Sequence, residues 1–220
     1  MLPELIRALL VPVSWLAFRP VVEGREHLPR EGPVILAANH LSALDSFLIP
    51  LVSPRRVAFL AKAEYFTRPG VRGRLIGSAL SGLGAVAVPR GELRAAQAAL
   101  ETALGVLNEG KGFGIHPEGS RSRDGRLYRG RTGVAWLALA SGAPVVPVAV
   151  LGTERVQPVG ARFPRPGRVT VRFGAPMSFR PPAGGAARAR REATDQIMAE
   201  IQKLSGQEAA GVYNELSAGQ

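Results

Sequence analysis

The sequence predicts an α/β protein, a single layered domain with a mixed, largely parallel sheet flanked by helices and preceded by an amphipathic N-terminal helix. Short apolar runs typical of buried strands alternate along the chain with longer runs of helical periodicity. With 220 residues, of which 46% are hydrophobic, the chain has the length and composition of one domain that buries its own core.

The first element is a helix over residues 2–18, with apolar side chains at helical spacing on one face: Leu2, Leu5, Ile6, Leu9, Leu10, Val13, Leu16 and Ala17. Polar residues interrupt this stretch, and it is shorter than the roughly 20 apolar residues that span a bilayer. Glu4 and the lack of a small-residue cleavage site argue against a signal peptide. The helix either lies in a membrane interface, with Trp15 and Phe18 near its end, or packs on the core. We take residues 1–20 as a membrane-associating helix.

The remaining elements follow from apolar runs and helical spacing. Strands are expected at residues 33–38, 57–61, 85–88, 113–116, 144–151 and 168–173, and helices at residues 42–51, 71–81, 93–108, 132–141 and 186–204. We therefore place the main domain at residues 21–205. The tail after Ser205 is small and polar, so residues 206–220 are expected to be disordered.

Charge and composition restrict the function. The chain has 28 Lys and Arg against 17 Asp and Glu, a net charge of +11, which favours polyanionic partners. Eight arginines and no acid lie between residues 162 and 191. Three interpretations of this run are open. It forms a solvated face, it faces anionic lipid, or it binds the phosphates of coenzyme A or the acidic surface of a carrier protein. Aromatic residues make up only 6% and no nucleic-acid motif is found, which argues against nucleic acid. The lack of cysteine excludes thiol catalysis and thiolate metal sites, and three scattered histidines offer no metal ligand set.

A histidine and an aspartate follow the strand predicted at residues 33–38. His40 lies just past the strand and Asp45 five positions later. If the helix begins at Ser42, the chain can bring Asp45 back to the imidazole, as a neutral histidine base requires. The same residues also read as a capping box, in which Ser42 and Asp45 cap the start of the helix.

A second block of polar residues follows the strand predicted at residues 113–116. Pro117, Glu118 and Gly119 form a tight turn, after which Ser120, Arg121 and Ser122 offer hydroxyl and guanidinium donors. Such donors at a strand end are suited to a phosphate. A solvated turn would have the same composition.

Together these blocks resemble the phospholipid/glycerol acyltransferase family, typified by bacterial 1-acyl-glycerol-3-phosphate acyltransferases. The family's first motif, Asn-His-x-x-x-x-Asp, is matched by Asn39, His40 and Asp45. Its third motif, Phe-Pro-Glu-Gly-Thr-Arg-Ser, is matched by residues 116–122, with His116 in place of Phe and Ser120 in place of Thr.

Three further segments resemble the same family. The second motif resembles residues 84–90, which end in Arg90, and the fourth resembles residues 145–150, with Pro147 at the centre. A family lysine resembles Lys62. The resemblance covers about residues 24–155, with the blocks in the family's order.

The resemblance implies an O-acyltransferase that moves a fatty acyl group to a lysophospholipid hydroxyl, most simply that of 1-acyl-glycerol-3-phosphate, to give phosphatidic acid. His40 is then the general base and Asp45 orients it. The substrate-binding residues expected from the motifs are Glu118, Gly119, Ser120, Arg121, Arg90 and Lys62. His116 is expected to pack beside the site.

The expected acyl donor is acyl-CoA or acyl carrier protein, with no cofactor and no metal. The expected partner is a membrane surface, with the protein peripheral or monotopic on the cytoplasmic face of the cell membrane. A relative acting on another lyso-lipid or a glycolipid, and more remotely a polyanion-binding protein without activity, remain alternatives.

Overall fold

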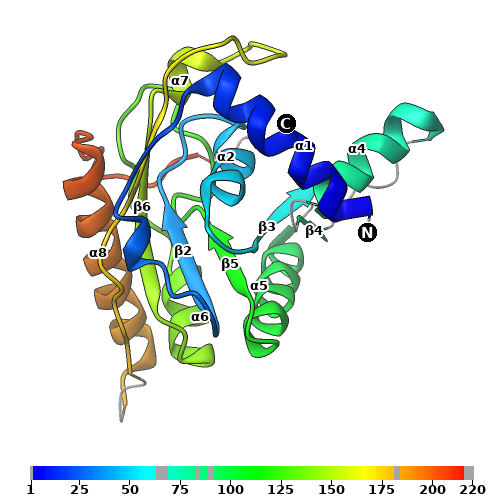
Figure 1. The fold of residues 1–220 in the computed structure, drawn as a ribbon. Coiled ribbons are helices and arrows are strands. Elements are labelled where there is room, and N and C mark those ends of the chain that lie inside the picture. The colour runs from blue at the N-terminus through cyan, green and yellow to red at the C-terminus, as the bar shows by residue number, and fades with distance from the viewer. Residues whose placement is uncertain (1, 63–68, 83–84, 89–91, 181–183, 216–220) are drawn as a thin grey trace.

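The computed structural model describes residues 2–62, 69–82, 85–88, 92–180 and 184–215. One seven-stranded sheet forms its centre, in the order β1-β7-β6-β2-β5-β3-β4 (Figure 1). All neighbouring strands are parallel except β6 and β7, which are antiparallel. The strands are β1 (Val21–Glu23), β2 (Val34–Ala38), β3 (Val57–Lys62), β4 (Val86–Val88), β5 (Gly112–Ile115), β6 (Val145–Leu151) and β7 (Thr170–Phe173). The predicted mixed, largely parallel sheet is confirmed.

Helices cover both faces of this sheet. They are α1 (Leu2–Phe18), α2 (Asp45–Val52), α4 (Gly70–Gly82), α5 (Glu92–Asn108), α6 (Gly133–Ser141), α7 (Thr153–Val156) and α8 (Ala186–Ser205), with a short 3-10 turn, η1 (Arg25–His27). The central strand β2 is buried on both sides because its residues alternate between two apolar clusters. Leu36 packs with α2 on one face, whereas Ile35 packs with α5, α6 and α8 on the other.

Two elements, β1 and α7, were not predicted because they are too short to show a periodic pattern. The three residues of β1 extend the sheet beside β7, and α7 is a single turn after β6. The helix predicted from residue 42 begins instead at Asp45. The Asp45 carboxylate binds the N–H groups of Leu41 and Ser42, which holds the residues before it in a turn.

The predicted disorder of the tail is wrong for residues 206–215. The backbone of Leu127 pairs with both Glu208 and Ala210, and the N–H of Arg129 donates to Val212. The small polar residues of the tail give no sign of the irregular segment at residues 127–129 that they bind. Residues 216–220 lie outside the described part of the chain.

The helix predicted at the N-terminus is confirmed, and one of its sides packs on the rest of the protein. It packs against α2 and α4. Phe18, expected in a membrane interface, instead packs against the core. The opposite side of the helix leaves Leu9, Val13 and Leu16 exposed. None of the helices in the described ranges is long and apolar enough to cross a bilayer.

Candidate active site

The two polar blocks meet at one edge of the sheet. β2 and β5 are adjacent and parallel, with Ala37 opposite Ile115, so both strands end at the same edge. Asn39 and His40 follow β2, and His116 follows β5. Ligands of open α/β sheets bind outside the carboxyl ends of the strands, which makes this edge the expected place for chemistry.

Asn39 fixes the point at which the first block leaves the sheet. Its side chain is fully buried and continues the pairing of β2 with β6. The amide nitrogen donates to the carbonyl of Val150, and the amide oxygen accepts the Val150 N–H, at 2.9 and 2.7 Å. The amide nitrogen also donates to Gln207 in the tail. The backbone of His40 therefore starts from a rigid position.

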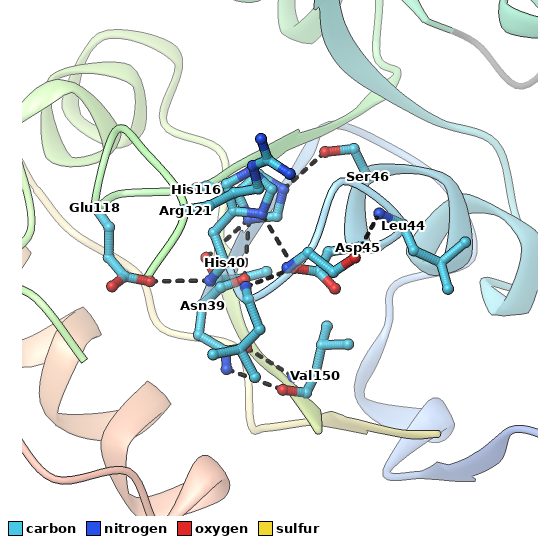
Figure 2. A network of polar contacts seen from close by, with 12 residues as sticks. Asn39, His40, Leu44, Asp45, Ser46, His116, Glu118, Arg121 and Val150 are labelled. Carbon is cyan, nitrogen blue, oxygen red and sulfur yellow. Dashed lines mark hydrogen bonds and ion pairs between the residues drawn. The ribbon is translucent and has the colours of Figure 1, made fainter. Parts of the chain in front are cut away.

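His40 and Asp45 form a hydrogen-bonded pair. Nδ1 of His40 lies 3.0 Å from Oδ2 of Asp45 (Figure 2). A carboxylate only accepts hydrogen bonds, so Nδ1 carries a proton, and in the neutral imidazole Nε2 then keeps its lone pair. The His40 side chain is 16% exposed, whereas Asp45 is fully buried. This neutral tautomer, held from behind by a carboxylate, is the form that a histidine base needs.

The Asp45 carboxylate is ionised and serves two purposes at once. Burial opposes its ionisation, but the hydrogen bond from His40 holds the pKa of Asp45 below its ordinary value. The same oxygen that holds His40 accepts the N–H groups of Leu41 and Ser42, at 2.7 and 2.8 Å. Asp45 thus closes the turn before α2 and orients the imidazole at the same time.

His116 supports the imidazole of His40 from the second block. The two rings are stacked, with centroids 3.9 Å apart and planes 8° from parallel. Nδ1 of His116 faces the carbonyls of Ala38 and Asn39 and therefore donates, so Nε2 accepts from the Ser46 hydroxyl. Burial, together with the nearby His40, lowers the pKa of His116 to about 3. His116 is therefore neutral, and its expected packing role is confirmed.

Glu118 braces the site from inside. It is fully buried, and one of its oxygens accepts the N–H of His40 at 2.9 Å (Figure 2). The other oxygen accepts the N–H of Tyr128, also at 2.9 Å. Burial raises the pKa of Glu118 to about 7. In this structure Glu118 supports the two loops, and its expected contact with the substrate stays a prediction. The N–H of Ser122 donates to the carbonyl of His40, which ties the same loops together again.

Comparison with known proteins identifies the family. Residues 19–151 match the family model described as Acyltransferase. The chain belongs to the acyltransferase family. Among its curated relatives, a 1-acyl-sn-glycerol-3-phosphate acyltransferase of Borreliella burgdorferi is 32% identical over 68% of this chain and 58% of the relative. A chloroplastic 1-acyl-sn-glycerol-3-phosphate acyltransferase of Arabidopsis thaliana is 33% identical over 64% of this chain and 38% of the relative.

A solved structure shares the fold of this acyltransferase family member. It is the crystal structure of the 1-acyl-sn-glycerophosphate (LPA) acyltransferase PlsC from Thermotoga maritima, which is 27% identical. The TM-score is 0.67, and the match covers 93% of this chain and 79% of that chain. This chain spans about 40% to 60% of the length of the two curated relatives named here.

The structure describes the surroundings of some of the remaining residues that were expected to bind substrate, but not of all of them. Gly119 has φ +80°, the left-handed region that favours glycine, and closes a turn in which its N–H donates to the carbonyl of His116. The Ser120 hydroxyl donates to the carbonyl of Glu215, and Arg121 lines a small hollow beside Leu41. Lys62 ends β3 without a described side chain, and Arg90 lies outside the described residues.

Sequence reasoning missed two supports of the site. The Asn214 side chain donates to the carbonyls of Ser120 and Arg121, and Gln157 accepts the hydroxyl of Ser42. Neither residue belongs to a motif, and only the tertiary contacts reveal them. Within the described ranges no three His, Asp or Glu side chains lie close enough together to hold a metal ion.

Proposed function

We propose that this protein is a 1-acyl-sn-glycerol-3-phosphate O-acyltransferase, which transfers a fatty acyl group from acyl-CoA or acyl carrier protein to lysophosphatidic acid. The observation that supports it most is the His40–Asp45 pair, in a chain whose named relatives carry that activity. The reaction as proposed uses no resident cofactor and no metal.

The proposed mechanism needs one base. A hydroxyl is a poor nucleophile, so Nε2 of His40 takes its proton as the oxygen attacks the thioester carbonyl. Asp45 holds the proton on Nδ1 and stabilises the imidazolium that forms. The tetrahedral intermediate then expels the thiolate, which takes the proton back from Nε2. A new ester bond replaces the thioester, and His40 returns to its neutral form without an acyl-enzyme.

The acceptor phosphate is proposed to bind cations and donors around the second block. Arg121 borders the hollow beside Leu41, the residue after His40. Its guanidinium offers two parallel hydrogen bonds to a phosphate. Ser120, the Gly119 turn, Lys62 and Arg90 are proposed to complete the phosphate contacts. The site is proposed to face the cytoplasm, where both thioester donors occur, with α1 as the peripheral anchor.

The test is a direct assay with detergent-dispersed acceptors. The purified protein is incubated with labelled acyl-CoA, and separately with acyl carrier protein, against a panel of lyso-acceptors, and the products are identified by mass spectrometry. We expect phosphatidic acid, and we expect His40→Ala to lower kcat at least about 100-fold, within the range of a general base. Acylation of another lyso-lipid or a glycolipid in preference would correct the acceptor. Wild-type turnover of the variant would refute the mechanism.

A further inference from the structure

The structure separates the arginines of residues 162–191 into two groups. Toward the C-terminal end of this run, Arg188 pairs with Glu192 and Arg191 with Asp195 along α8. Arg172 pairs with Glu23 beside the sheet. In contrast, no carboxylate of the described residues pairs with any of three arginines that follow α7: Arg162, Arg165 and Arg168. Their positive charge faces solvent.

Exposed apolar side chains lie among these arginines. Phe163 is 72% exposed and Val159 is 60% exposed. The Arg162 guanidinium lies 5.5 Å from the centroid of the Phe163 ring, so the ring and the charge share one small surface. A large aromatic side chain left in water beside cations is typical of a binding surface.

This segment is fixed beside the end of α1. The N–H of Gly167 donates to the carbonyl of Ala17, and the N–H of Val169 donates to that of Phe18. An open groove of about 520 Å³ lies between them, lined by Leu16, Ala17, Arg19, Pro166, Gly167 and Arg168. Figure 1 shows α1 and the segment after α7 at the end of the molecule where α2 begins. The exposed stripe of α1, formed by Leu9, Val13 and Leu16, therefore lies beside the segment 157–168.

The segment also borders the active-site loop. Val159, Gly160 and Gln157 line the small hollow that Leu41 and Arg121 share. Gln157 further accepts the Ser42 hydroxyl at 2.9 Å. A surface that held this segment would lie next to the loop that carries His40.

From these contacts we infer that residues 157–168 are a second membrane-contact element, which docks with the C-terminal half of α1 on an anionic bilayer. Phe163, Val159 and Leu16 enter the headgroup region, and Arg19, Arg162, Arg165 and Arg168 bind lipid phosphates. A bilayer interface accommodates both the apolar and the cationic side chains of such a surface. An acidic protein would pair with the arginines but leaves the exposed stripe of α1 without a function.

Vesicle binding by this surface does not depend on the chemistry at His40, because it is measured with His40→Ala as readily as with the native protein. Failure of vesicle binding would thus be distinguishable from failure of the acyl-transfer assay with detergent-dispersed acceptors.

The first experiment is sedimentation with vesicles of phosphatidylcholine, with and without phosphatidylglycerol, at low and high salt. The double variant Arg162→Gln/Arg165→Gln is compared with Arg188→Gln/Arg190→Gln on α8, which removes the same charge. We expect the first pair to weaken binding to the anionic vesicles about 10-fold or more at low salt, and the α8 pair less than about twofold. Equal weakening by the two pairs would mean that only net charge matters and would overturn the inference.

The second experiment detects insertion of the segment directly. Phe163→Trp is made in a Trp15→Phe background. The other tryptophan of that protein, Trp136, packs against the core. We expect a blue shift of the emission on anionic vesicles and quenching by lipids brominated on their acyl chains. The Trp15→Phe protein that keeps Phe163 is the control for the emission of Trp136. A tryptophan emission that is neither shifted nor quenched would overturn the inference. So would arginine variants that no longer bind an acidic carrier protein but still bind vesicles.

Discussion

Asp45→Asn is the sharpest test of how His40 is held. The asparagine oxygen can take the place of Oδ2 and accept the N–H groups of Leu41 and Ser42, so the start of α2 survives. Only the negative charge behind the imidazole is lost. We therefore expect the protein to remain folded while its turnover falls.

The size of the loss follows from the distance between the charges. Two unit charges at the 3.0 Å between His40 Nδ1 and Asp45 Oδ2 would attract by about 5.5 kcal/mol at an effective dielectric constant of about 20. Both charges are delocalised, and an effective separation of about 5 Å lowers this attraction to about 3 kcal/mol. Because the imidazolium forms only as the hydroxyl is deprotonated, kcat is expected to fall roughly 100- to 300-fold with little change in KM.

The assay measures kcat, KM and the melting temperature on the same preparations. Ser42→Ala is the matched control, since it removes the hydroxyl contacts to Leu44 and Gln157 but leaves the imidazole untouched. We expect this control to lose about 1 kcal/mol of stability and to keep most of its turnover. An Asp45→Asn variant that stays folded and turns over within about tenfold of the native protein would refute the reasoning. A joint collapse of kcat and melting temperature would mean that Asp45 serves chiefly as the cap of α2.

Three further predictions concern the supports of the site and the membrane surface. Burial raises the pKa of Glu118 from 4.5 to about 7, so the stability that this group contributes is greatest at low pH and is lost as the pH rises through about 7. Glu118→Gln should therefore gain about 2 kcal/mol relative to the native protein between pH 5 and pH 8 in denaturant titrations, and a constant difference would contradict this. His116→Phe keeps a flat ring against His40 and should retain kcat within about tenfold, whereas His116→Ala should lose more; equal kcat for the two variants would argue against the stacking role. Arg19 follows α1 with φ 40°, so Arg19→Gly should raise the melting temperature while weakening binding to anionic vesicles, and unchanged vesicle binding would be inconsistent with the membrane surface.

The alternation of strands and helices was readable from the sequence because each element carries its own period. The apolar run Val145–Leu151 and the helical spacing within Glu92–Asn108 are patterns of residues close together in the chain. The structure forms β6 and α5 at these two places. The shortest elements were missed for the same reason. The three residues of β1 are too few to show a period, and pairing with β7 alone makes them a strand.

The candidate site divides in a similar way. The residue types and spacing of the two blocks pointed to His40 and Asp45, but five positions on a regular helix would separate them. They meet because residues 41–44 form a turn closed on the Asp45 carboxylate. The sequence also marked Glu118 as a site residue, but not its direction. Only the fold shows that its oxygens bind backbone amides of His40 and Tyr128.

The sequence by itself determined the fold class, the order of most elements and the residues of the proposed active site. The tertiary structure alone decided which groups are buried and which partners they have. Residues 206–215 show the difference, since a polar tail becomes ordered by binding Leu127 and Arg129 far away in the chain. The physical reason is that periodicity is set by neighbours a few positions apart. Burial, pKa and hydrogen-bond partners are set by contacts such as that of His40 with Glu118, 78 positions away.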